Sequence, residues 1–144
     1  MTSLLVERLQ KSFAIYDELV AHLPETALTS KLSTLPSNTI GQQLWCVVGA
    51  RESYIKGIQK GEWDGFSCSL RETDNKKDVS GALTNSAALA SGTIGHLANL
   101  TDAQEKLAFD LLEHEIQHQG QLIRYLYGLK LGIPAGMKAR YHLD

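Results

Sequence analysis

The sequence has few of the residues and patterns that would decide its class at once. Its 144 residues contain two cysteines and three prolines, and no run of lysine or arginine is long enough to follow a nucleic-acid backbone. Two cysteines do not make a disulfide framework in a chain that can build its own core. With a net charge of -2, the composition argues against a disulfide-stabilised secreted domain and against a nucleic-acid-binding protein.

Long apolar segments are missing as well. A membrane-spanning helix needs about 18 or more consecutive apolar residues, and polar or charged residues interrupt every candidate segment before that length. The first twenty residues carry scattered charges and lack the apolar core and cleavage site of a signal peptide. The 43% hydrophobic and 21% charged residues are ordinary for a globular chain. We therefore expect one cytoplasmic domain, residues 1–144, that binds neither membranes nor nucleic acid.

Four segments show the period of an amphipathic helix, with apolar side chains at spacings of three and four. Proline, glycine and helix-capping residues mark where these segments begin and end. The predicted helices run from about Thr2 to Leu23, from Ser37 or Asn38 to between Gly57 and Gly61, from about Ser80 to Leu100, and from Thr101 to between Gly128 and Gly132.

An unusually long connection joins the second and third predicted helices. The segment "GEWDGFSCSLRETDNKKDVSG" has three glycines, mixed charges and no consistent period, and it exceeds the usual connection of about 4–6 residues. No segment shows the alternation expected of strands. We therefore predict an all-α protein, a four-helix bundle with up-down-down-up topology, because a long crossover lets the second and third helices run parallel.

The last predicted helix carries two histidines on its apolar face. In "HEIQHQGQ", residues 114–121, His114 and His118 lie one helical turn apart. A single inward histidine is usually hydrogen-bonded in the core, whereas two neighbouring imidazoles need a shared partner, most commonly a metal. Spacing alone leaves both interpretations open. The rest of this stripe consists of Leu107, Leu111, Gln121, Tyr125 and Leu129, and the histidines without a partner at metal spacing are His22, His96 and His142.

The same segment contains the His-Glu-x-x-His pattern of zinc peptidases. Such an enzyme needs a third protein ligand, and Asp144 is the only acidic residue after the motif. The extended motif also fails, because Gly120 comes one residue early and Arg124 stands at the third histidine position. Glu115 lies about 100° round the helix from the first histidine and is interpreted as a solvated or supporting residue. We therefore do not predict a peptidase.

Two segments resemble signatures of the DinB-like superfamily, the DinB- and YfiT-type metalloproteins with a four-helix-bundle fold. "NTIGQQLWCVVGARESY" is similar to the Ile-Gly-x-x-Leu-x-His motif of the second helix in that family. "LLEHEIQHQGQLIRYLYGLKLGIP" is similar to the closing helix, His-x-x-x-His-x-Gly-Gln followed by an aliphatic stretch, a glycine and a proline. The resemblance spans most of the chain. Its matching residues in the closing helix are His114, His118, Gly120, Gln121, Gly132 and Pro134.

One position departs from the family pattern. Cys46 stands six residues after Ile40, where the family has its first metal-binding histidine. A thiolate is an accepted zinc ligand, so the resemblance implies a divalent-metal site of Cys46, His114 and His118, with zinc favoured and nickel second. Two other interpretations of the cysteine stay open. It is a small buried hydrophobe in a chain that has lost metal binding, or a nucleophile paired with His114.

The best understood members of the superfamily are thiol-dependent enzymes. An open metal position there lowers the pKa of a low-molecular-weight thiol and aims its thiolate at an electrophile. The resemblance therefore implies a thiol-dependent transferase or a hydrolase that acts on a small molecule, and the alternative is a non-catalytic dimeric bundle without metal. Candidates to line the approach to the site, if they are not simply solvated, are Arg51, Glu52, Tyr54, Trp63 and Phe66.

A second apolar line lies almost opposite the histidines on the last predicted helix. It consists of Phe109, Leu112, Ile116 and Ile123. Apolar lines on two sides of one helix indicate that both sides are covered. The long loops of the chain would cover this line in a monomer, and a second copy would cover it in a homodimer. Because proteins of this type are often dimers, we expect a homodimer.

Overall fold

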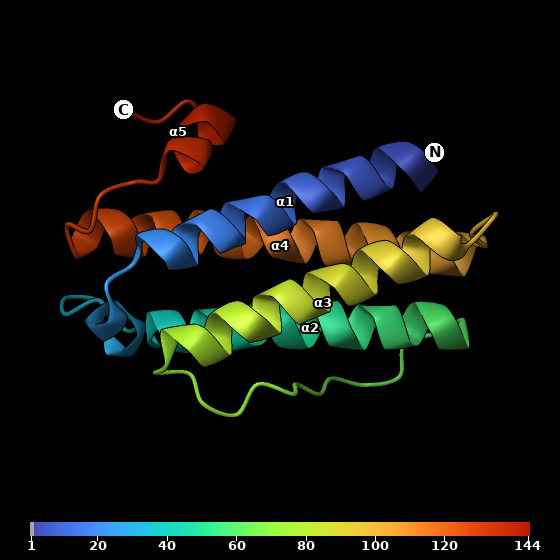
Figure 1. Ribbon diagram of the computed structural model, residues 1–144, viewed down its shortest axis with the longest axis horizontal. Helices are drawn as coiled ribbons and strands as arrows, with labels where there is room; N and C mark the ends of the chain where they lie inside the picture. The colour runs from blue at the N-terminus through green and yellow to red at the C-terminus, as the bar shows by residue number, and fades with distance from the viewer. Residues whose placement is uncertain (1) are drawn as a thin grey trace.

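Helices make up the regular structure of residues 2–144, which the computed structural model describes. Four long helices pack side by side, with a short 3₁₀ helix and a short C-terminal helix at one end (Figure 1). No strand occurs within this range, so the all-α prediction is confirmed. The elements are α1 (Thr2–His22), η1 (Glu25–Thr29), α2 (Ile40–Lys60), α3 (Lys76–His96), α4 (Asp102–Gly128) and α5 (Ala135–Tyr141).

The crossover between α2 and α3 sets the directions of the helices. Figure 1 shows that α2 and α3 run the same way, and that α1 and α4 run the opposite way. The crossover lies along α2, where the Ser53 hydroxyl donates to the Ser67 carbonyl at 3.0 Å and accepts from the Ser67 N–H at 2.9 Å. It passes so close to Gly49 that a Cβ there would collide with the Phe66 ring.

Capping boxes define the starts of α2 and α4. The Thr39 hydroxyl accepts from the Gln42 N–H and the Gln42 side chain accepts from the Thr39 N–H, and Thr101 and Gln104 do the same on α4. The predicted start of α4 is confirmed. The predicted start of α2 at Ser37 or Asn38 is wrong, because both side chains make other contacts, with the N–H of Leu32 and with Gln43 and Tyr125 respectively.

Two further differences concern the third helix and the C-terminal segment. The Asn75 side chain caps α3, so this helix begins and ends about four residues before the predicted limits. The sequence predicts no helix after Gly132, so α5 is an addition to the predicted elements. Proline is suited to the start of a helix, and here Pro134 precedes α5, which buries Met137 and donates the Gly136 N–H to Glu18.

A polar layer separates two apolar clusters in the interior. One cluster joins the C-terminal half of α1 and the N-terminal half of α2 to η1 and α5, and the other lies at the opposite end of the long helices. None of the helices in residues 2–144 combines the length and the apolar composition that a membrane crossing requires. The polar layer consists of Ser12, Arg51, Ser86, Glu115 and Gln119, all buried.

Candidate metal centre

The three predicted ligands come together between α2 and α4. Cys46 lies on α2, and His114 and His118 lie one turn apart on α4. Their donor atoms all lie within 4.8 Å of one another, and Cys46 Sγ is 3.7 Å from His114 Nε2. Metal bonds of about 2.0–2.3 Å in tetrahedral geometry place neighbouring donors roughly 3.5 Å apart. The cluster therefore has the donor set and nearly the spacing that a zinc ion needs.

A chain of hydrogen bonds orients the His118 ring. Gln43 Nε2 donates to Asn38 Oδ1 at 2.9 Å, which leaves Gln43 Oε1 to accept from His118 Nδ1 at 2.5 Å. The hydroxyl of Tyr125 donates to the Asn38 carbonyl and lies 2.7 Å from Asn38 Oδ1. This network assigns the proton of His118 to Nδ1 and leaves the Nε2 lone pair free. Outer partners of this kind fix the tautomer and the orientation of metal-binding histidines.

His114 has fewer protein partners than His118. Its Nε2 faces the Cys46 thiol, and its buried Nδ1 makes no hydrogen bond within the described residues. The ring centroid lies 4.5 Å from that of His118 and 6.5 Å from that of Tyr54. Hydrogen bonds therefore orient the His118 ring, whereas the His114 ring is held by contacts with Cys46, His118 and Tyr54.

Burial sets the protonation of all three side chains. It lowers the pKa of His118 to about 4, with a further lowering by the neighbouring His114, and it lowers the pKa of His114 as well. Both imidazoles are therefore neutral at pH 7, as metal binding requires. Burial raises the pKa of the Cys46 thiol. A nucleophilic Cys46 paired with His114 would need a lowered thiol pKa, so these directions argue against that interpretation.

Glu115 and Arg51 occupy places that sequence analysis did not predict. Both side chains are fully buried, and two hydrogen bonds join them, at 3.1 Å from Arg51 Nε and 2.9 Å from Nη2. Ser12 Oγ donates to the same carboxylate at 3.1 Å, and the guanidinium lies 4.3 Å from the centre of the Phe13 ring. Glu115 is therefore neither solvated nor a general base for water, and Arg51 does not line the approach.

The other predicted approach residues divide into two groups. Glu52 holds the crossover, because its carboxylate accepts from the N–H and hydroxyl of Ser69 at 2.8 and 2.5 Å. Tyr54 lies beside the cluster, with its ring centroid 6.5 Å from that of His114, and the Trp63 ring lies 4.9 Å from Tyr54. Phe66 packs against Trp45 at 5.3 Å. Of the predicted approach residues, Tyr54 neighbours a ligand, whereas Arg51 and Glu52 are engaged elsewhere.

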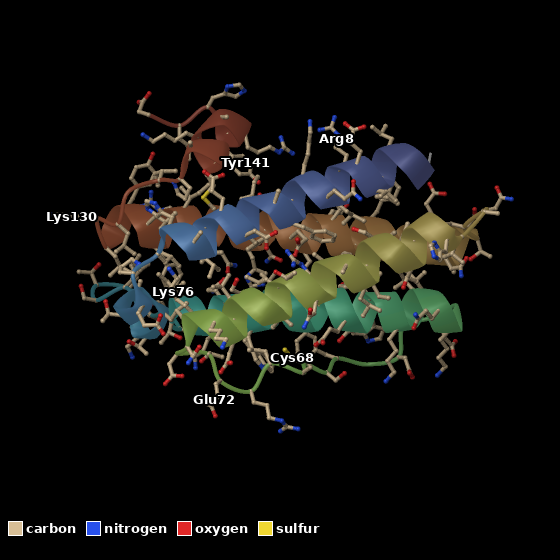
Figure 2. All side chains as sticks on the ribbon, viewed as in Figure 1. Arg8, Cys68, Glu72, Lys76, Lys130 and Tyr141 are labelled. Atoms are coloured by element: carbon tan, nitrogen blue, oxygen red, sulfur yellow. The ribbon has the colours of Figure 1, made fainter. Side chains whose placement is uncertain are left out.

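One prediction on a neighbouring residue is wrong, and the second cysteine lies apart from the cluster. Gln121, assigned to the apolar stripe of the last helix, is exposed. Cys68 stays outside the cluster, and its thiol donates to the Trp45 carbonyl at 3.3 Å, on the crossover beside α2 (Figure 2). Sequence reasoning missed Gln43, although its position three residues before Cys46 placed both side chains on one face of the helix.

The second apolar line of α4 is only partly exposed. Leu112 and Ile123 pack against the two core clusters, and Ile116 is half-buried, while Phe109 is 39% exposed. Other parts of the same chain therefore cover much of the line. The homodimer stays a prediction.

Comparison with known proteins returns no match: no family model, curated protein or solved structure is significantly similar to the chain. The resemblance to the DinB-like superfamily accordingly rests on the two sequence motifs and stays a prediction.

Proposed function

We propose that the chain is a DinB-like metalloprotein with an up-down-down-up four-helix bundle. The long crossover and the directions of the four long helices in Figure 1 support this fold assignment. Support for the family comes from the two motifs, which meet in space: Cys46 of the first lies beside His114 and His118 of the second. Residues that are 68 positions apart in the chain, Cys46 and His114, are in direct contact.

The function that the cluster supports best is the binding of one divalent metal, zinc, through Cys46 Sγ and the imidazoles of His114 and His118. A thiolate and two neutral imidazoles are a donor set that zinc accepts well. The observation that carries the proposal is the oriented His118, because Gln43 presents its Nε2 lone pair to the cluster. A buried histidine needs an acceptor for its Nδ1 proton in any case, so what favours a metal is that this acceptor leaves the free Nε2 for the cluster with Cys46 and His114.

The reaction class we propose is transfer of a low-molecular-weight thiol to a small electrophile, with hydrolysis as the second choice. A divalent cation with three protein ligands keeps one position open and lowers the pKa of a thiol or water bound there. The chain contributes orientation and an aromatic wall. Gln43 holds His118, and the rings of Tyr54 and Trp63 bound the side next to His114. A small apolar or aromatic electrophile would fit against such a wall.

Metal content tests the proposal directly. Protein purified without an affinity histidine tag and without added metal is analysed for bound elements, beside Cys46→Ala and the matched control Cys68→Ala. We expect about one zinc per chain in the parent and in Cys68→Ala, and loss of the metal in Cys46→Ala. A parent without metal, or a Cys46→Ala variant that keeps it, contradicts the three-ligand site.

The alternative is a non-catalytic helical module that has lost metal binding. The observation that favours it is Cys46 at the position where the family has its first metal-binding histidine. A 580 Å³ cavity between α2, α3 and the crossover has none of the three ligands in its lining, so a ligand bound there would not contact the cluster. Under this alternative, zinc and a chelator would leave the melting temperature unchanged, and His118→Ala would behave as a core substitution only. A metal-dependent rise in melting temperature of the parent that is absent in Cys46→Ala excludes this alternative.

A further inference from the structure

A groove runs between α1, α4 and α5, on side chains that the metal cluster does not use. Its wider part has a volume of 320 Å³ and is lined by Leu4, Leu5, Arg8, Phe109, Leu112 and Arg140. A narrower recess continues inward from Leu112 and Arg140 to the buried Ser12 and Gln119. A third hollow lies between Lys11 on α1 and Arg140 on α5. The volume lies in the range of about 300–1,000 Å³ typical of small-molecule sites.

Three cations surround the groove, and none has an acidic partner. Among residues 2–144, no carboxylate lies within 4.0 Å of the charged nitrogens of Arg8, Lys11 or Arg140. Arg8 and Lys11 are one turn apart on α1, and Arg140 comes from α5. Figure 2 shows Arg8 and Tyr141 on the same side of the molecule, and Tyr141 directly follows Arg140 in the chain. This local excess of positive charge contrasts with the net charge of -2 for the whole chain.

The outer part of the groove is apolar and open to water. Leu4 is 56% exposed and Phe109 is 39% exposed, while Leu5 and Leu112 form the floor between them. The inner polar atoms are already satisfied, because Gln119 Nε2 donates to Ser12 Oγ at 2.7 Å and Tyr141 donates to Gln119 Oε1. The groove thus offers apolar surface at one end and free positive charge at the other.

We propose that this groove binds a free single-chain aliphatic carboxylate, with Arg8, Lys11 and Arg140 around the carboxylate and Leu4, Phe109 and Leu112 along the chain. The planar guanidinium matches a carboxylate through two parallel hydrogen bonds, and two of the three cations are arginines. Inorganic anions would leave the apolar part uncovered, and a neutral chain would leave the cations unpaired.

The shape of the groove favours a small ligand over a membrane or a protein. A helix that lies on a membrane presents its apolar side chains on a convex face, whereas here they line a groove between α1 and α4, with Arg140 of α5 beside it. A stable protein interface buries about 800 Å² on each partner, and the exposed apolar part of this groove involves two large side chains, Leu4 and Phe109.

Isothermal titration calorimetry with decanoate below its micellar concentration tests the proposal on the full chain. We expect one site per chain, with affinity rising up to about fourfold for each methylene from hexanoate to decanoate. Decanol should bind at least about tenfold more weakly, and decyltrimethylammonium should not bind. Zinc and chelator should leave the affinity for decanoate unchanged, because the two sites share no residue. Absence of zinc binding would therefore contradict only the metal site, and absence of decanoate binding only the groove.

Matched variants separate the groove from the rest of the surface. Arg140→Gln should weaken decanoate binding by about tenfold, and Phe109→Asp should abolish it. Arg124 is an exposed arginine on α4 outside the groove, so Arg124→Gln should bind as the parent does, and melting temperatures confirm that all three variants fold. Equal binding of decanoate and decyltrimethylammonium, or no binding of either, overturns the proposal. So does a stable dimer that Phe109→Asp dissociates, or binding to phosphatidylcholine vesicles in place of free decanoate.

Discussion

Arg51 and Glu115 form a bidentate ion pair in the centre of the protein, with both side chains wholly removed from solvent. The pair joins α2 to α4, and Arg51 Nη1 extends it to α3 by donating to the Leu83 carbonyl at 3.0 Å. Tyr16 connects α1 to the same region, because its hydroxyl donates to the main-chain carbonyl of Glu115 at 2.5 Å. Burial raises the pKa of Glu115, and the guanidinium opposes that rise. Four helices therefore converge on one charged contact.

Removing one partner of this pair should be far more damaging than removing both. Glu115→Gln leaves the Arg51 guanidinium buried without a counter-charge, and we expect the free energy of unfolding to fall by about 3–5 kcal/mol. The double variant Arg51→Met and Glu115→Leu restores apolar packing and should lose much less. Urea unfolding measures both. If Glu115→Gln lost no more stability than the double variant, an unpaired Arg51 would carry no such penalty.

Gln43 should control metal affinity without touching the metal. Gln43→Leu removes the acceptor that holds the proton on His118 Nδ1, and we expect zinc affinity to fall by about 10–100-fold. Gln59→Leu, at an exposed position of the same helix, is the control and should bind zinc as the parent does. Competition with a chromophoric chelator gives both constants. An unchanged affinity in Gln43→Leu would show that the ring needs no such support.

The metal-free protein should lose stability on acidification because of His118. Burial lowers the pKa of this imidazole to about 4 from 6.5, so between these values the unfolded chain binds the proton more readily than the folded chain. The free energy of unfolding attributable to His118 should therefore be fully present above pH 6.5 and fall by about 3 kcal/mol at pH 4. Urea unfolding across this range should show a shallower pH dependence for His118→Gln than for the parent. Parallel pH profiles of the two proteins would contradict the assignment.

Two glycines should respond oppositely to alanine. A Cβ on Gly41 would collide with the backbone carbonyls of Thr73 and Leu28, so Gly41→Ala should cost about 1–3 kcal/mol of stability. Gly92 lies within α3 with nothing near its Cβ position, so Gly92→Ala should stabilise by about 0.5–1 kcal/mol. Thermal unfolding of the two variants checks the pair. Similar losses in both would mean that the crossover does not pack tightly against α2.

Much of the local structure follows from patterns in the sequence. Helical periodicity, glycine and capping residues located α1 and α4 to within one or two residues. The errors arise where one residue type serves two purposes. Thr39 caps α2 in preference to Ser37 and Asn38, which other parts of the chain engage, and Pro134, which lies beyond the last predicted helix, precedes a new one.

The candidate site also has features that follow from the sequence and features that only the fold reveals. The sequence by itself determined that His114 and His118 share one helical face, because this is a matter of spacing along the chain. Cys46 was predicted as their partner only through the resemblance of its segment to a family motif. Only the tertiary structure decided that Glu115 pairs with Arg51 in the core, that Gln43 orients His118, and that α5 contributes Arg140 to a groove. These depend on which helices meet and on how burial makes charged and polar groups seek partners, and no local pattern in the sequence contains that information.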